Sequence, residues 1–375
     1  MYPKIRLRYI LKCLKVLLLE KNNNKAVINN DNKNLLLVKT DAIGDYILFR
    51  NFIEEIKTLS LFTDFKITLV ANELVKDLVS EFDLKFLENV VYINRKSFTN
   101  SLFYRKQIYT EINKTNFQYA INPSFSRDYL IADSLIRKSN AKHKIGQLGN
   151  FSNDYAFFKN ISDNWYNQII DTSSGIQFEF LRTKKFLESI AGQSMNIVKP
   201  SLPLNTKTTE NYVVIFPGAG EKIKQWNPIN FATTANVIHQ KTGLKIVIAG
   251  SKFDTDLANE IIENVTNKNN IENYCGKTTL VELANLISGA TCLITNDSSA
   301  YHMAACMQTK TICLLIGRHY GRFAPYPFDG LKHQIFYVLP PSFNTLNFKE
   351  EEIFSIDEIK SETVTQLFFD KIYTS

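Results

Sequence analysis

Residues 35–57, which read LLLVKTDAIGDYILFRNFIEEIK, constrain the fold more than any other part of the chain. The four apolar residues at 35–38 predict a buried strand, which ends at the polar residues Lys39, Thr40 and Asp41. Beyond a short turn, apolar residues recur at helical spacing, so a helix is expected to lie against the sheet. This strand–turn–helix unit is typical of an open α/β sheet.

The turn passes through Gly44 and brings a carboxylate, Asp45, to the start of the helix. An open α/β sheet forms its binding site at the carboxyl ends of its strands, which is where this turn lies. An acidic residue there also caps a helix and interacts favourably with its dipole. From this segment alone, a helix cap and a site residue explain Asp45 equally well.

Strand and helix patterns alternate along most of the chain, which predicts an α/β fold with mostly parallel sheets covered on both faces. Residues 146–167 are aromatic and irregular and fit neither pattern. The expected strands are residues 35–39, 66–71, 90–93, 119–122, 212–216, 245–249, 292–295 and 311–316. The expected helices are residues 46–59, 74–81, 128–138, 177–191, 231–241, 255–264, 279–287, 300–307 and 355–369.

A chain of 375 residues is long enough for two domains, and a proline-containing polar stretch separates two alternating series. We expect two Rossmann-like domains whose carboxyl sheet edges face one another across a cleft. The expected divisions are an N-terminal segment 1–30, a first domain 31–195, a linker 196–211, a second domain 212–350 and a C-terminal helix 351–375 that packs back on the first domain.

Composition indicates a globular protein, with 45% hydrophobic and 22% charged residues. A net charge of +7 suits an anionic ligand or surface without indicating nucleic acid as the partner. The cysteines are odd in number and scattered, which favours reduced thiols in a cytoplasmic protein and no metal site. They are Cys13, Cys275, Cys292, Cys306 and Cys313.

The first 25 residues predict a basic amphipathic helix rather than a signal peptide, because basic and apolar residues interleave and no small-residue cleavage site follows. Such a helix can lie on an anionic membrane surface or pack on its own domain. The expected apolar stripe is Leu7, Ile10, Leu11, Leu14, Leu17 and Leu18, with Lys4, Arg6, Arg8, Lys12 and Lys15 as the basic residues.

In the second series, a strand is followed by the small residues Gly218, Ala219 and Gly220, and then by Lys224. Small residues let backbone N–H groups approach an anion, and the lysine would neutralise phosphate charge. The pattern is neither the dinucleotide fingerprint nor a P-loop, and an ordinary glycine-containing turn explains it as well.

A second polar cluster, Asn296, Asp297, Ser298 and Ser299, joins a strand to a helix of small residues, with His302 one turn further on. These side chains are suited either to capping the helix or to holding the phosphate and hydroxyls of a ligand.

Two weaker candidates also follow strands. Asp254 or Asp256 is placed to accept hydrogen bonds from ribose hydroxyls, and Lys277 with Thr278 is placed to line a base or phosphate pocket. Thr279 and Glu282 form a predicted capping box, which is a purely structural explanation for that turn.

Taken together, these motifs resemble the ADP-heptose:lipopolysaccharide heptosyltransferase family, glycosyltransferase family 9, which has the two-Rossmann GT-B fold. The similar segments occur in the family's order and cover roughly residues 35–60 and 212–325. They are LVKTDAIGD, PGAGEKIKQW and GKTTLVELANLISGATCLITNDSSAYHMAA.

The resemblance implies roles for the site residues. Asp45 would be the general base of an inverting transfer, and Lys224 would bind the donor diphosphate. Asp297 and the adjoining helix start would hold the donor near His302, and Asp254 would contact the nucleotide ribose. The remaining donor-binding residues would be Gly218, Ala219, Gly220, Lys277, Thr278, Asn296, Ser298 and Ser299. On the acceptor side we expect Lys39, Thr40, Gly44 and Arg127.

The implied function is transfer of heptose or a related sugar from a nucleotide-diphosphate donor resembling ADP-heptose. The acceptor would be the lipopolysaccharide core or another lipid-linked glycan at the cytoplasmic face of the inner membrane, with no metal or cofactor. Ser299 stands where the family usually has glycine, and Gly220 where it often has a hydroxyl residue, so the donor can differ. A GT-B sugar-nucleotide epimerase or hydrolase and a catalytically silent GT-B binding module stay open as alternatives.

Overall fold

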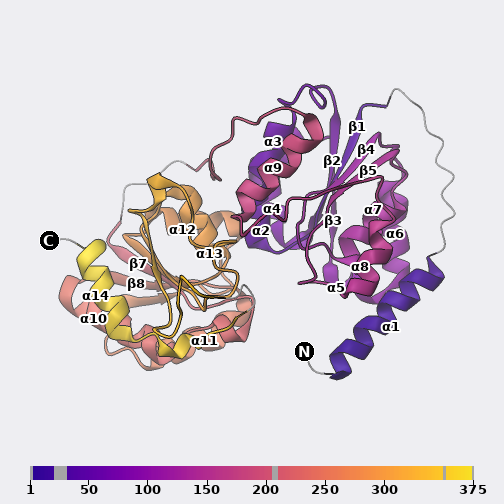
Figure 1. Ribbon diagram of the computed structural model, residues 1–375. Helices are drawn as coiled ribbons and strands as arrows, with labels where there is room; N and C mark the ends of the chain where they lie inside the picture. Colours follow the sequence, from indigo (N-terminus) through magenta and orange to yellow (C-terminus); the bar gives the residue numbers. More distant parts are fainter. Residues whose placement is uncertain (1–2, 21–31, 205–209, 349–351, 374–375) are drawn as a thin grey trace. The chain divides into compact units, whose positions relative to one another are not determined.

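The computed structural model describes residues 3–20, 32–204, 210–348 and 352–373, and the chain divides into two compact units, Met1–Val198 and Lys199–Ser375 (Figure 1). The boundary falls inside the linker expected at 196–211. Part of that linker, residues 205–209, lies outside the described residues, as does most of the join between the N-terminal segment and the first strand.

In the first unit, the described residues form a six-stranded parallel sheet with the order β3-β2-β1-β4-β5-β6. Its strands are β1 (Asn34–Lys39), β2 (Lys66–Asn72), β3 (Asn89–Ile93), β4 (Tyr119–Asn122), β5 (His143–Gln147) and β6 (Gln168–Ile170). From β1 the later strands are added first on one side, as β2 and β3, and then on the other side, beginning with β4. The carboxyl ends of β1 and β4 therefore lie side by side. This is the topological switch point at which open α/β sheets bind ligands.

In the second unit, the described residues form a parallel sheet with the same plan, in the order β12-β11-β10-β7-β8-β9. Its strands are β7 (Tyr212–Phe216), β8 (Lys245–Ile248), β9 (Ile271–Asn273), β10 (Cys292–Asn296), β11 (Thr311–Leu314) and β12 (Ile335–Val338). Here the switch point lies between β7 and β10. Both units are therefore Rossmann-like, as the alternating sequence pattern predicts.

Helices cover both faces of each sheet (Figure 1). In the first unit they are α1 (Pro3–Leu19), α2 (Ile43–Phe49), α3 (Asn51–Ile56), α4 (Lys76–Leu78), α5 (Arg95–Asn100), α6 (Leu102–Ile112), α7 (Ser134–Lys138), α8 (Ala156–Asp163) and α9 (Glu179–Ala191). In the second they are α10 (Pro228–Thr242), α11 (Thr255–Glu263), α12 (Leu280–Gly289), α13 (Ser299–Met307) and α14 (Ser361–Lys371). Figure 1 shows α12 and α13 on one face of the second sheet, with α10, α11 and α14 on the other.

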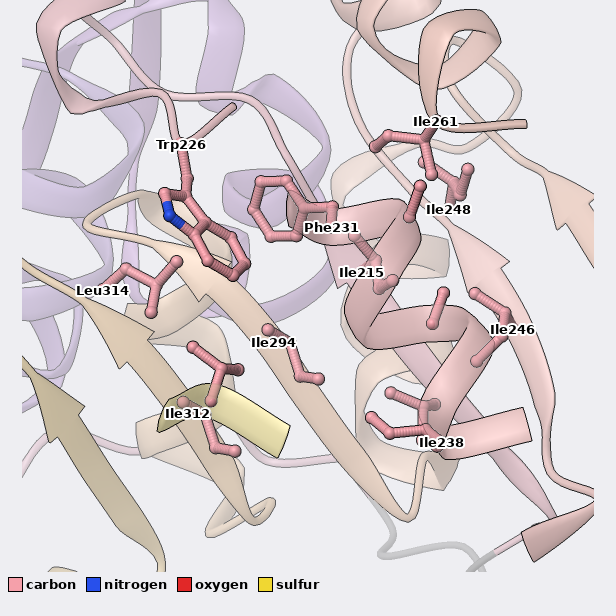
Figure 2. Close-up of a cluster of buried hydrophobic side chains, with 14 of the residues drawn as sticks. Ile215, Trp226, Phe231, Ile238, Ile246, Ile248, Ile261, Ile294, Ile312 and Leu314 are labelled. Carbon is pink, nitrogen blue, oxygen red and sulfur yellow. The ribbon is translucent and has the colours of Figure 1, made fainter. Parts of the chain in front are cut away.

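A continuous apolar core lies beneath α10, α11 and α14, where isoleucines of four strands point to one face (Figure 2). Trp226 closes this core near the carboxyl ends of the strands, where its ring meets Phe231 edge-on at 4.9 Å. The indole N–H donates to the carbonyl of Ile359 at 2.9 Å, so the buried nitrogen is satisfied. These contacts fix Trp226 in the core, two residues after Lys224.

The C-terminal helix belongs to the second unit, which corrects the expectation that it packs back on the first domain. Val364, Phe368 and Ile372 of α14 and its end are buried in the same core as Trp226. Burial against this sheet satisfies the apolar face of α14 completely, since Val364 and Phe368 have no exposed surface.

Three expected helices of the first unit are broken. The helix expected at 46–59 divides at Arg50 into α2 and α3. Those expected at 74–81 and 128–138 contain π-helical turns at Val79–Asp83 and Tyr129–Asp133. Residues 146–167, which fitted no pattern, contain the end of β5 and the helix α8.

The N-terminal helix α1 packs on the first unit, with Cys13 and Val16 buried in its core. At its C-terminal end, buried Glu20 pairs with the guanidinium of Arg105 and accepts a hydrogen bond from Tyr109 at 3.0 Å. The side chains of Lys4 and Arg6, expected among its basic residues, lie outside the described part. None of the helices in the described ranges is both long and apolar enough to cross a bilayer.

We expect Phe368→Ala to destabilise the second unit by about 3–5 kcal/mol, because it leaves a cavity beneath α14 in a fully buried site. Urea unfolding in a Trp165→Phe background, followed by the fluorescence of Trp226, measures this loss, since that indole lies in the same core. Leu346→Ala is the matched control, because Leu346 is 95% exposed. Equal stability of the two variants would contradict the placement of α14.

Candidate functional site

The switch point of the first sheet assembles a compact polar cluster from the ends of β1 and β4. The ammonium of Lys39 lies 2.7 Å from Asp41 Oδ2 and 3.5 Å from the hydroxyl oxygen of Ser124. That hydroxyl also contacts the Asp41 carboxylate. Lys39 is only 3% exposed, so its charge depends on these partners rather than on water.

Electrostatics keeps this buried pair ionised. Burial by itself would lower the pKa of Lys39, but Asp41 and then Asp45 outweigh it and raise that pKa above its ordinary value. Burial would likewise raise the pKa of Asp41, whereas Lys39 and the Ser124 hydrogen bond hold it below its ordinary value. The cluster therefore presents a fixed cation beside two carboxylates, Asp41 and Asp45.

Asp45 lies in the first turn of α2, although not at the capping position. The helix begins at Ile43, and Ala42 occupies the N-cap without a side-chain hydrogen bond. Asp45 is thus the third helical residue, where its charge is favourable to the helix dipole but its side chain is not an N-cap. Gly44 and Asp45 are both partly exposed, whereas the next four residues are buried.

Thr40 is buried beside this cluster, and within the part of the chain that the structure describes its hydroxyl has no hydrogen-bond partner. Its carbonyl accepts a hydrogen bond from Arg95 of α5. Arg95 also pairs with Asp128 at 3.1 Å, so the end of β1 is connected to α5 and to the turn before α7.

The structure places Arg127, the fourth expected acceptor-side residue, in a buried cluster of its own. It pairs with Asp133 at 3.4 Å and with Asp163, and its guanidinium lies 4.7 Å from the centroid of the Tyr166 ring. Asn122 at the end of β4 donates to Asp133 at 3.2 Å. Arg127 therefore supports the end of β4 through this hydrogen-bonded neighbour.

In the second sheet, the switch point joins the ends of β7 and β10. The amide nitrogen of Asn296 donates to the carbonyl of Pro217 at 2.7 Å, and its oxygen accepts from the backbone of Trp226 at 3.2 Å. These bonds hold the turn after β7 against the end of β10. Lys224 within that turn consequently reaches Asp297, with 2.6 Å between Nζ and Oδ2.

The Lys224–Asp297 pair lies at the start of α13. Ser298 is the N-cap residue and makes no capping bond with its side chain, and its hydroxyl lies 3.0 Å from that of Thr295. Ser299 is the first helical residue and is partly exposed. The backbone N–H groups that begin α13 are therefore combined with an adjacent lysine, which is an arrangement that favours anions.

His302 lies one turn into α13 and is almost completely buried. Its Nδ1 is 2.9 Å from the hydroxyl of Tyr326. Burial lowers the pKa of His302 to about 4, with Lys224 adding to the effect and Asp297 opposing it. The imidazole is neutral at physiological pH, so it acts as a hydrogen-bonding group rather than a cation.

Asp254 and Gly218 meet directly. The Asp254 carboxylate accepts from the backbone and hydroxyl of Ser251, each at 2.7 Å, in a capping box. A Cβ built on Gly218 would lie 2.5 Å from that carboxylate, so this position requires glycine. The three small residues differ in exposure, with Gly218 buried, Ala219 partly exposed and Gly220 exposed.

Lys277 and Thr278 line a pocket of about 730 Å³ beside α12, and Lys224 and Asp297 are not among its lining residues. The Lys277 ammonium donates to the carbonyl of Asn273 at 2.6 Å. The capping box of Thr279 and Glu282 is confirmed. The structure therefore brings Gly218 together with Asp254, and Lys224 together with Asp297. Lys277 and Thr278 line a pocket that contains neither pair.

Three residues at the first edge were missed as site candidates: Asp41, Ser124 and Arg95. Asp41 follows Lys39 and Thr40 at the polar end of the first expected strand, and Ser124 follows the expected strand at 119–122. Had the strand order been assumed, the fourth strand would have been placed beside the first, and Ser124 beside Lys39. No sequence signal marks Arg95, which follows β3 on a short helix.

The sequence model of glycosyltransferase family 9 (heptosyltransferase) matches residues 128–351, which is more than half of the chain. The chain belongs to glycosyltransferase family 9. The matched range contains the edge formed by Lys224, Asp297 and His302, whereas Asp45 lies before it.

Relatives agree with this membership. Over 132 residues the family-9 chain is 29% identical to lipooligosaccharide heptosyltransferase 2 of Campylobacter jejuni, a match that covers 35% of this chain but only 41% of that protein. The glycosyltransferase family 9 structure from Veillonella parvula superposes with a TM-score of 0.70 at 18% identity, covering 93% of this chain and 99% of that one. The structure of the Escherichia coli heptosyltransferase WaaC with ADP superposes with a TM-score of 0.67 at 16% identity, and the match covers 90% of this chain and 99% of that one. These likenesses show the GT-B fold.

The depressed pKa of His302 makes stability depend on pH in a defined direction. The unfolded chain binds a proton on this residue below about pH 6.5, whereas the folded protein resists doing so until about pH 4. The free energy of unfolding should therefore fall as pH drops through this window, by up to about 3 kcal/mol. Urea unfolding of His302→Gln across pH 4–7 should lack this component, whereas the exposed-site control His333→Gln should keep it. Parallel curves for both variants would contradict the assignment.

Proposed function

We propose that this family-9 chain is an inverting glycosyltransferase. It would transfer heptose or a related sugar from a nucleotide-diphosphate donor to the lipopolysaccharide core or another lipid-linked glycan, at the cytoplasmic face of the inner membrane. The observation that carries the proposal is the second sheet edge of a family-9 chain, where Lys224 is held beside the N-terminus of α13.

Lys224 is suited to the donor diphosphate because it is held in place without being sealed from solvent. Its side chain is 16% exposed, compared with 3% for Lys39. A diphosphate would compete with Asp297 for the ammonium of Lys224. It would also accept hydrogen bonds from the backbone N–H groups at the start of α13. In the transfer step, the same cation would stabilise the negative charge that develops on the leaving diphosphate.

Asp45 is proposed as the general base. The acceptor hydroxyl would attack the anomeric carbon of the donor from the side opposite the diphosphate, and Asp45 would accept the hydroxyl proton as the C–O bond forms. Inversion follows from this single displacement. The nearby Lys39–Asp41 pair supplies a rigid charged support, and the buried Thr40 hydroxyl has hydrogen-bonding capacity to offer the acceptor.

The donor is proposed to resemble ADP-heptose. Support comes from the similarity to WaaC, whose structure was solved with ADP, and from the heptosyltransferase relative. Ser299 and Gly220 differ from the family's usual residues, and both are at least partly exposed at the second edge. The side chain of Ser299 and the missing hydroxyl at Gly220 would alter how the phosphates and the sugar of the donor are held.

A thermal-shift comparison of ADP-, UDP-, GDP- and CDP-sugars tests donor binding, because a ligand that binds only the folded state raises apparent stability. We expect the ADP-sugar to give the largest shift and Lys224→Ala to lose most of it. The matched control is Lys332→Ala, which also removes a lysine paired with an aspartate at 2.6 Å, but at an exposed site. Absence of any shift in the unaltered protein would overturn the proposed donor class.

Asp45→Asn tests the base. We expect a loss of turnover of about 10²–10⁴-fold with the donor-dependent thermal shift retained, since the amide cannot accept the proton. Asp64→Asn is the control, because the Asp64 side chain is 69% exposed and pairs only at the surface with Lys33. Unchanged turnover in Asp45→Asn, measured as product formed with acceptor present, would rule out this role.

A further inference from the structure

A pocket of about 530 Å³ lies between α1, α5 and the turn before α7. Arg8 and Lys12 line it from α1, Arg95 and Lys96 from α5, and Asp128 from the turn. Its volume is in the range of small-ligand sites. None of these residues belongs to either edge cluster except Arg95, which reaches from the pocket to the carbonyl of Thr40.

The pocket has an excess of positive charge. Four of its lining side chains are cations and one is a carboxylate, and that carboxylate, Asp128, is already paired with Arg95. Among the described residues, no carboxylate pairs with Arg8, Lys12 or Lys96. Convergent cations without partners attract an anion, and arginine with lysine is the usual combination for phosphate.

The same helix exposes a ridge of leucines. Leu7, Leu11 and Leu18 are 60%, 55% and 66% exposed, whereas Cys13 and Val16 on the opposite face are buried. Arg8 and Lys12 occupy the flank between these two faces, because residues four apart share one side of a helix. An exposed apolar ridge beside basic side chains is typical of a helix that lies in the interface of an anionic membrane.

Two anchors hold α1 in this orientation. Tyr9 donates a hydrogen bond to Asp154 at 2.9 Å near the pocket, and Glu20 pairs with Arg105 at the far end of the helix. The pocket is therefore formed by packing within the unit and does not need a ligand to order it. A preformed site loses less entropy on binding.

From these features we infer that the pocket binds the phosphate of an anionic lipid headgroup, while Leu7, Leu11 and Leu18 enter the acyl boundary. The inference deepens the membrane part of the proposed function and does not depend on sugar transfer. It commits to a lipid because a free phosphate would explain the cations but not the exposed leucines.

Flotation of the full chain with vesicles of phosphatidylcholine alone, or mixed with phosphatidylglycerol, tests the site. Binding is expected only to the mixed vesicles, and Lys12→Glu should weaken it about tenfold more than Lys15→Glu. Lys15 is the matched control because it lies exposed on the same helix, outside the pocket lining, and its reversal changes the net charge equally. Equal losses would indicate general charge attraction and would overturn the pocket.

A second pair of variants keeps the test independent of α1 folding. Lys96→Glu on α5 should also weaken binding to the mixed vesicles. Lys106→Glu, at an exposed site on α6, should weaken it only by the effect of the changed net charge.

The double variant Leu7→Gln with Leu11→Gln should reduce flotation, and glycerol phosphate alone should give no comparable protection against unfolding. Strong protection by glycerol phosphate with unchanged flotation would overturn the lipid assignment. A donor-dependent thermal shift that persists in the Lys12 and Lys96 variants separates this site from the proposed transfer site.

Discussion

Parallel strand pairing is the constraint on which the rest of this structure depends. Each sheet follows one plan, with its first strand at the centre and its fourth strand as the neighbour on the other side. Because all paired strands run in one direction, the carboxyl ends of β1 and β4 meet, as do those of β7 and β10. This pairing brings Ser124 after β4 to Lys39 and Asp41 at the end of β1, and holds Asn296 of β10 against Pro217 after β7.

Each edge contains a lysine–aspartate pair, and the two pairs differ in burial. Lys39 is 3% exposed and bonded to Asp41 beside Ser124, so removing either charge would leave the other uncompensated. Lys224 and Asp297 are 16% and 13% exposed, so this pair can exchange partners with a ligand. We therefore expect the first pair to support the site and the second to bind within it.

The sequence predicted what local patterns determine and missed what long-range contacts decide. The eight expected strands lie within about two residues of their predicted bounds, because buried parallel strands form continuous apolar runs. The sequence missed β5, which lacks such a run, and the edge strands β6, β9 and β12. The capping box at Thr279 was confirmed because it is a local signal. Arg127 was expected near the base, but it pairs with nearby Asp133 and with Asp163 at the end of α8. The second contact depends on how α8 packs, which no local pattern encodes. The contact of Asp41 with Ser124 was missed because the two residues are 83 positions apart in the chain. The site roles of Asp45, Lys224 and the other candidates stay predictions.

Helix α1 shows that two explanations left open by the sequence are compatible. A single stripe of leucines suggested that α1 either packs or faces a membrane. The structure divides this stripe: Ile10 and Leu14 are partly buried and pack with Cys13 and Val16 against the core, whereas Leu7, Leu11 and Leu18 are exposed. On the packed side, Glu20 pairs with Arg105 and Tyr9 donates to Asp154. Once packing is satisfied by this face, the large leucines and the flanking cations remain for another surface. Packing and membrane binding are therefore compatible uses of the same helix, because each uses a different face.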